Sequence, residues 1–203
     1  MTPAVTFLTF LLAAGTCSAA TVTLTLKDVR GAALEDAVVW AMPKSGEAPP
    51  RKRPAAVEQR DKTFIPIVSV IQTGSLVSFP NRDEIRHHVY SFSPAKIFEI
   101  KLYAGTPADP ILFDKPGEVV LGCNIHDHMY AYIYVVDTPW FAKAGKDGVA
   151  KLDLPGGEYE LHAAYYAQAQ KPPPVAMTLK AEENAVADFA FTLRPMPPRP
   201  TRH

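Results

Sequence analysis

Residues 122–129 read Gly-Cys-Asn-Ile-His-Asp-His-Met, and this stretch decides which fold we expect. Cys123 offers a thiolate, His126 an imidazole and Met129 a thioether, spaced as Cys-x2-His-x2-Met. Thiolate and imidazole donors with a long, weak thioether contact form the ligand set of copper sites that transfer electrons. The stretch therefore predicts a copper site in one short loop.

The residues on both sides of this loop predict β-strands. Residues 118–123 and 130–136 are rich in Val, Leu, Ile and Tyr, which favour strands. Because the loop would join two strands at one end of a sandwich, we expect its three donors to point at a common volume. The missing imidazole must come from another strand at that end, where His87 or His88 begins a strand. Two imidazoles and a thiolate would then form a trigonal site with a long axial thioether.

Strand signals recur along the whole chain, and no segment keeps a helical period. Residues 21–27 alternate with the period of two that a half-buried strand shows. We expect further strands at residues 37–42, 63–71, 75–79, 88–92, 98–102, 111–113, 149–152, 175–179 and 187–193, and a turn followed by a strand within residues 154–161. Twenty prolines and eleven glycines suit short strands joined by turns. The expected fold class is all-β, with antiparallel strands packed as in a sandwich.

Composition excludes several classes of function. The 203 residues carry 21 basic and 21 acidic side chains, so the formal net charge is zero and does not favour a nucleic acid or an anionic membrane as partner. The basic run at residues 51–53 lies in a Pro-rich stretch, residues 43–62, which we interpret as a solvated loop and not as a docking patch. No nucleophile is paired with a base, so hydrolysis has no support. We expect no enzyme, and a catalytic copper site with an open coordination position is the alternative.

The first 20 residues have the character of a secretory signal. Residues 6–14 are almost entirely apolar, no charged side chain precedes Lys27, and small residues occupy positions 18–20. A basic residue at the start is missing. We expect export to the periplasm, cleavage after about residue 20, and no membrane span because the apolar core is too short. Cys123 would then be the only cysteine, which excludes an internal disulfide and favours a metal-ligand role.

These motifs resemble the cupredoxins, and the short ligand loop is similar to that of amicyanin more than to that of plastocyanin. Val-Ser-Phe-Pro-Asn at residues 77–81 resembles the strand before the family's first histidine ligand. Residues 116–123 resemble the strand that delivers the cysteine. The likeness covers roughly residues 60–137, and the spacing from Asn81 places the family's first ligand on His87. The chain is also similar to exported proteins labelled methylamine-utilisation or plastocyanin-like proteins.

The resemblance implies a Greek-key β-sandwich that binds one copper ion per chain and exchanges single electrons with a redox partner protein in the periplasm. The ligands it implies are His87, Cys123, His126 and Met129.

Three departures from the family pattern leave the ligand set open. His88 stands where the family usually has asparagine, Arg86 replaces a common proline, and His128 lies inside the ligand loop. We expect His88 to face away from His87, because neighbours on a strand point to opposite faces. We interpret His128 as an exposed rim residue, although it could compete with Met129. These extra donors motivate an alternative function, a periplasmic copper chaperone or sensor without redox cycling.

The two ends of the chain resemble carboxypeptidase-regulatory-like β-sandwiches. Residues 154–159 read Leu-Pro-Gly-Gly-Glu-Tyr, which is similar to the signature of that family. The resemblance implies that residues 21–45 and 139–193 form a second small sandwich around the first. Extra strands on one enlarged sandwich are the alternative. We expect the tyrosines at alternate positions of residues 130–136 to pack against this unit, although an electron relay is conceivable, and residues 194–203 to form a disordered tail.

Overall fold

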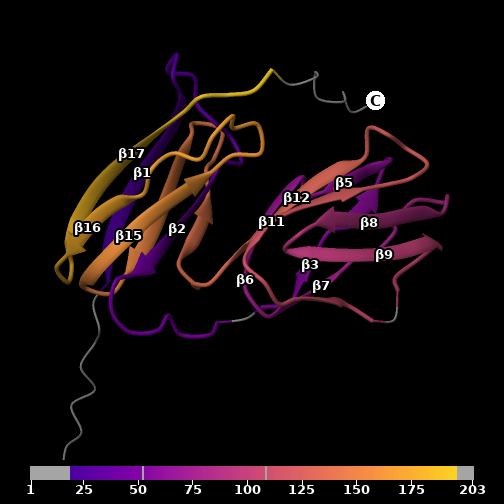
Figure 1. Cartoon of the computed structure of the whole chain (residues 1–203), viewed down its shortest axis with the longest axis horizontal. Helices are drawn as coiled ribbons and strands as arrows, with labels where there is room; N and C mark the ends of the chain where they lie inside the picture. Colours follow the sequence, from indigo (N-terminus) through magenta and orange to yellow (C-terminus); the bar gives the residue numbers. More distant parts are fainter. Residues whose placement is uncertain (1–18, 52, 108, 196–203) are drawn as a thin grey trace, which may run out of the picture.

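The structure is a computed structural model that describes residues 19–51, 53–107 and 109–195. These residues form strands and no helix, so the fold is all-β as predicted. The strands are β1 (Ala20–Asp28), β2 (Val38–Pro43), β3 (Ala55–Ala56), β4 (Glu58–Arg60), β5 (Thr63–Ile65), β6 (Val68–Gln72), β7 (Ser75–Ser78), β8 (His87–Ser93), β9 (Lys96–Tyr103), β10 (Ile111–Phe113), β11 (Gly117–Gly122), β12 (Tyr130–Val136), β13 (Phe141–Lys143), β14 (Val149–Leu154), β15 (Gly157–Ala164), β16 (Val175–Leu179) and β17 (Asn184–Phe191). They gather in two β-sandwiches that lie side by side (Figure 1).

The chain ends build one of these sandwiches, which confirms the second unit predicted from the N- and C-terminal segments. Its sheets have the strand orders β14-β1-β17 and β13-β2-β15-β16. β1 lies between β14, to which it is antiparallel, and β17, to which it is parallel. The period-two pattern of β1 places Val22, Leu24 and Leu26 in the core and the threonines between them on the outside.

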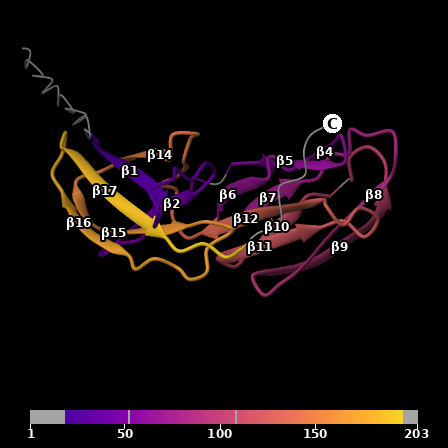
Figure 2. The same cartoon turned by 90° about the horizontal axis from the view of Figure 1, so that it is seen from above.

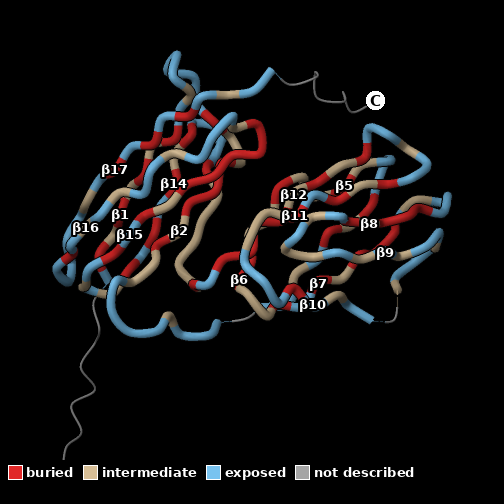
Figure 3. The backbone as a smooth tube through the Cα atoms, viewed as in Figure 1, coloured by how far each residue is buried: buried red, intermediate tan, exposed pale blue. Residues whose placement is uncertain are grey.

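The middle of the chain builds the other sandwich. A five-stranded sheet, β6-β12-β11-β8-β9, is joined by the three-stranded sheet β10-β7-β3 and the pair β4-β5. Their inward side chains form one core, in which Leu121 lies opposite Ala131 and Val119 opposite Ile133 across the antiparallel pair β11–β12. Figure 3 shows the buried segments of both sandwiches on their inner strands. This core holds rigid the two strands that carry the ligand loop.

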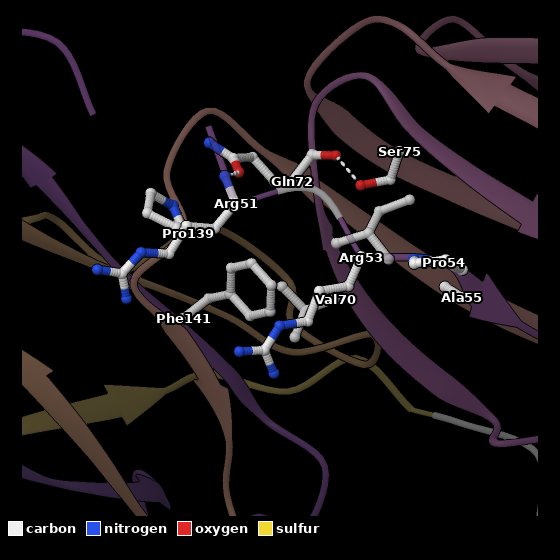
Figure 4. Close-up of a pocket in the computed structure, with 10 residues that line it drawn as sticks. Arg51, Arg53, Pro54, Ala55, Val70, Gln72, Ser75, Pro139 and Phe141 are labelled. Carbon is white, nitrogen blue, oxygen red and sulfur yellow. Dashed lines mark hydrogen bonds between the residues drawn. The ribbon is translucent and has the colours of Figure 1, made fainter. Parts of the chain in front are cut away.

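Part of the Pro-rich stretch that was predicted to be a solvated loop is paired. β3 runs parallel to β7, and β4 is antiparallel to β5. The loop before them is anchored to Gln72, whose Oε1 accepts a hydrogen bond from the Arg51 amide at 2.7 Å (Figure 4). The loop prediction is therefore wrong for residues 55–60, because composition does not report partner strands that lie further along the chain.

The two sandwiches contact each other through β6 and β12, which lie on the side nearest the second sandwich (Figure 2). The ring of Tyr132 stacks on that of Tyr166 with centroids 5.1 Å apart. The Lys143 ammonium donates to the Val68 carbonyl at 2.9 Å. The expected packing against the second sandwich is therefore present for Tyr132 and Tyr134, whereas Tyr130 lines the cavity beside the ligand loop.

The chain termini are described only in part. Residues 1–18 of the predicted signal lie outside the described residues, and Ala20 begins β1. Arg194, the first residue of the predicted tail, makes two hydrogen bonds to backbone carbonyls, those of Tyr166 and Ala167. Residues 196–203 lie outside the described part. In the described ranges, no helix has the length and apolarity needed to cross a bilayer.

Candidate metal centre

The ligand loop is closed at its base by strand pairing. Gly122 at the end of β11 pairs with Tyr130 at the start of β12, so Cys123 and Met129 stand opposite each other where the loop begins and ends. Within the loop, the Met129 amide donates a hydrogen bond to the His126 carbonyl at 2.9 Å. β8 pairs with the other side of β11 and begins at His87. Three strands thus bring the predicted residues to one end of the sandwich.

One donor atom from each of His87, Cys123 and His126 lies within 4.8 Å of the other two. The Cys123 sulfur is 3.9 Å from Nδ1 of His87 and 4.0 Å from Nδ1 of His126. A sulfur about 2.3 Å and a nitrogen about 2.0–2.1 Å from a shared ion, at trigonal or tetrahedral angles, are about 3.5–3.8 Å apart. Each of these two nitrogens therefore lies within a few tenths of an ångström of the distance from sulfur that a shared metal ion requires.

Burial differs among the four predicted ligands. His87, Cys123 and Met129 are 0%, 4% and 2% exposed, whereas His126 is half-buried. Met129 and Cys123 line the same cavity at the base of the ligand loop. The pKa of His126 is lowered, mainly by partial burial and to a smaller extent by the charges of His87 and His128. A lower pKa favours the neutral imidazole, which is the form that binds metals.

Asp83 orients His87. Its carboxylate oxygen lies 2.7 Å from Nε2 of His87, so this nitrogen carries the proton and Nδ1 is left free to face the cysteine sulfur. The backbone amides of Asp61 and Lys62 donate to the same carboxylate at 2.7 and 3.0 Å. Partial burial alone would raise the pKa of Asp83, but the Lys62 amide, His87 and the Asp61 amide together lower it. A carboxylate behind a ligand histidine fixes its tautomer and orientation.

Sequence reasoning missed Asp83, although its position four residues before His87 was visible. Asn81 was noted only for its spacing, and the structure shows what it does. Its side-chain oxygen accepts from the Asp83 amide at 2.9 Å, and its amide group donates to the Ile85 and Tyr103 carbonyls at 2.8 and 3.0 Å. Asn81 therefore holds the turn that delivers both Asp83 and His87.

The two extra histidines stand outside the donor group found among the described residues. His88 is buried at an irregularity in the pairing of β8 with β9, and its Nε2 lies 2.9 Å from the Glu99 carboxylate. His128 is exposed, and its ring centroid is 5.7 Å from that of His126. The structure therefore engages His88 with Glu99, outside the donor group, and leaves His128 exposed beside His126.

Several solved cupredoxin structures resemble part of this chain. A copper-containing nitrite reductase from Thermus scotoductus SA-01 is 27% identical over 46% of this chain, with a TM-score of 0.38, and the match spans 25% of the reductase's length. A purple cupredoxin from Nitrosopumilus maritimus is 16% identical, with a TM-score of 0.35, over 41% of this chain and 99% of its own. An amicyanin variant in its reduced Cu(I) form is 16% identical, with a TM-score of 0.37, over 47% of this chain and 97% of its own.

With TM-scores below 0.5, these likenesses carry no functional conclusion for this chain. No protein-family model and no curated protein matches it. The resemblance of the chain ends to carboxypeptidase-regulatory-like sandwiches stays a prediction. Just under half of the chain is similar to cupredoxins of solved structure, and in the nitrite reductase the match covers a quarter of the enzyme.

Proposed function

We propose that this chain is an exported, non-enzymatic protein that binds one copper ion through His87, Cys123, His126 and Met129 and carries single electrons. The observation that supports this most is the convergence of the Cys123 sulfur and two imidazole nitrogens, at 3.9 and 4.0 Å, beside a buried methionine. Thiolate and imidazole donors with a weak thioether suit copper better than other first-row metals. A copper ion held there would supply the Cu(II)/Cu(I) couple, which exchanges one electron.

The protein's own residues would keep this donor set unchanged between the two oxidation states. Cys123 and Met129 stand at the paired ends of β11 and β12, and Asp83 restrains the ring of His87. Burial of His87, Cys123 and Met129 excludes water from the donors. Donors that do not move when the charge of the ion changes keep the reorganisation energy small, so electrons transfer quickly.

Electrons would enter and leave through His126, which is the proposed ligand with the most exposure. Ile125 beside it is 48% exposed, which gives the loop an apolar surface. We propose that a redox partner protein in the periplasm docks on this surface. Small apolar contacts around an exposed redox edge suit brief encounters between electron carriers.

The test is titration of the purified full-length protein with Cu(II), followed by visible absorption. We expect intense thiolate-to-copper absorption that saturates at one equivalent and is absent in Cys123→Ser. His128→Ala is the matched control, because it removes a loop imidazole outside the donor group. Colourless copper binding that does not depend on Cys123 would contradict the proposal.

A periplasmic copper chaperone or sensor is the second candidate. The exposed His128 ring beside His126 favours it, since an extra imidazole could take part in ligand exchange. A chaperone should release copper to a chelator more slowly after His128→Ala. A carrier should show reversible voltammetry that this substitution leaves unchanged.

A further inference from the structure

A second cavity, of about 330 Å³, lies where the two sandwiches meet. β2 and β15 of the terminal sandwich line one side, and β11 and β12 of the other sandwich line the opposite side. Glu118 of this cavity precedes Cys123 by five residues along β11, which corresponds to about 16 Å of strand. The cavity is therefore separate from the candidate metal centre, and the proposed function does not use it.

The terminal sandwich contributes a flat aromatic wall. Trp40 and His162 are register partners on β2 and β15, and their rings stack with centroids 5.3 Å apart and planes 11° apart. Burial lowers the pKa of His162, so its ring is neutral at neutral pH. Met42 lines the cavity on the same face of β2 and extends the apolar surface. Such a wall suits a planar apolar group.

The other sandwich contributes two polar side chains that are register partners, Glu118 on β11 and Tyr134 on β12. Tyr134 is 4% exposed, and its hydroxyl has no partner at ordinary hydrogen-bond distance within the described part of the chain. The nearest polar group that acts on it is the Glu118 carboxyl, and the two side chains shift each other's pKa. Buried hydroxyls almost always have a hydrogen-bond partner, so one that lines a cavity without a partner suggests a ligand. Glu118 offers acceptor oxygens beside it.

The charges around the cavity offset one another. Glu118 and Asp137 are acidic lining residues, and Lys171 is a basic one. Arg194 also acts on Glu118 from the terminal sandwich. Two acidic and two basic side chains leave no net charge to favour an ionic ligand.

We propose that this cavity binds a small, uncharged aromatic molecule that carries a hydroxyl group, with its ring against Trp40 and its hydroxyl bonded to Tyr134 and Glu118. Cavities of this size hold small organic molecules, and a single ring with one substituent fits. Contact with the aromatic wall would supply most of the affinity. The Tyr134 hydroxyl would favour a ligand that carries a hydroxyl group with which it can form a hydrogen bond.

The experiment is calorimetric titration of the full-length protein with phenol and with toluene, which has the same ring without the hydroxyl. We expect phenol to bind one site about tenfold more tightly than toluene, the effect of one hydrogen bond. Tyr134→Phe should weaken phenol binding about tenfold and leave toluene binding unchanged. Tyr132→Phe is the matched control, because it removes a hydroxyl from the same face of β12 outside the cavity.

Additional variants and ligands test which residues form the binding site. Trp40→Leu should weaken both ligands, and Glu118→Gln gives a second reading of the polar wall if Tyr134→Phe does not fold. Phenol should bind equally to metal-free and copper-loaded protein, so failure of the copper proposal would leave this result intact. The proposal would be overturned if phenol did not bind, if phenol and toluene bound equally well, or if the two Tyr→Phe variants had equal effects. It would also be overturned if phenol binding depended on copper, or if benzylammonium or benzoate bound more tightly than phenol.

Discussion

The Nε2 atom of His87 lies 2.7 Å from the Asp83 carboxylate, and that single contact decides which ring nitrogen faces Cys123. Donor identity at this site was readable from residue types, since thiolate, imidazole and thioether each have a preferred metal chemistry. The tautomer was not readable, because it depends on how the turn after Asn81 folds. Two single side chains can be tested directly: Asp83, which orients a proposed ligand, and Glu118, whose burial shifts its pKa.

Asp83→Asn should weaken copper binding about 10- to 100-fold, because the amide no longer provides the negative charge that restrains His87 and raises its basicity. The measurement is competition for copper against a chelator of known affinity. Glu84→Gln is the control, since it removes the neighbouring exposed acid. Equal affinities of the two variants would show that Asp83 does not orient the ligand.

Glu118→Gln should stabilise the protein at neutral pH. Burial raises the pKa of Glu118 in the folded state, although Tyr134, Arg194 and Lys171 act against this. The folded state then binds the proton more tightly than the unfolded chain, so stability is present at low pH and is lost as pH rises through the folded pKa. Thermal unfolding at several pH values should show the variant's Tm advantage growing from about pH 4 to pH 7. An advantage that shrinks over that range would contradict the pKa direction.

At the scale of elements, alternation within a strand carries most of the fold. β12 spans Tyr130–Val136, the bounds predicted from its composition, and its pattern places Ala131 and Ile133 in the core. β3, β4 and β13 were missed. They are two or three residues long and owe their strand geometry to distant partners, β7, β5 and β2. Local pattern cannot predict a strand that exists only because another strand pairs with it.

Ile133→Ala should lower the free energy of unfolding by about 2–5 kcal/mol, because it leaves a cavity in the core beneath the ligand loop. Urea denaturation of the metal-free protein measures this. Leu112→Ala is the control on β10, where the side chain is exposed, and should change stability by less than about 0.5 kcal/mol. Similar losses in the two variants would contradict the assigned faces.

At the scale of the whole molecule, β1 and β2 meet strands more than a hundred residues later to form one sandwich, and the candidate metal centre lies in the other. Tyr132 and Tyr166 join the two units by ring stacking. The cavity lined by Trp40 and Tyr134 exists only because the units adopt this arrangement.

Tyr132→Ala should lower the free energy of unfolding by about 1 kcal/mol or more through loss of the stacked pair, whereas Tyr132→Phe keeps the ring and should leave stability nearly unchanged. Thermal and urea unfolding measure the difference. Copper affinity should be the same in both variants, because the ring faces the second sandwich. If alanine and phenylalanine behave alike, the stacked pair does not hold the units together.

The ligand types, their loop spacing and the all-β class could be read directly from the amino-acid sequence. These properties are local, since residue chemistry and period-two alternation are written into neighbouring positions. The tertiary structure was needed to show that Asp83 restrains His87 and that Tyr134 lines a cavity between the two sandwiches. Each of these depends on which distant strands pair and in what register, and that is settled by burial of the whole core.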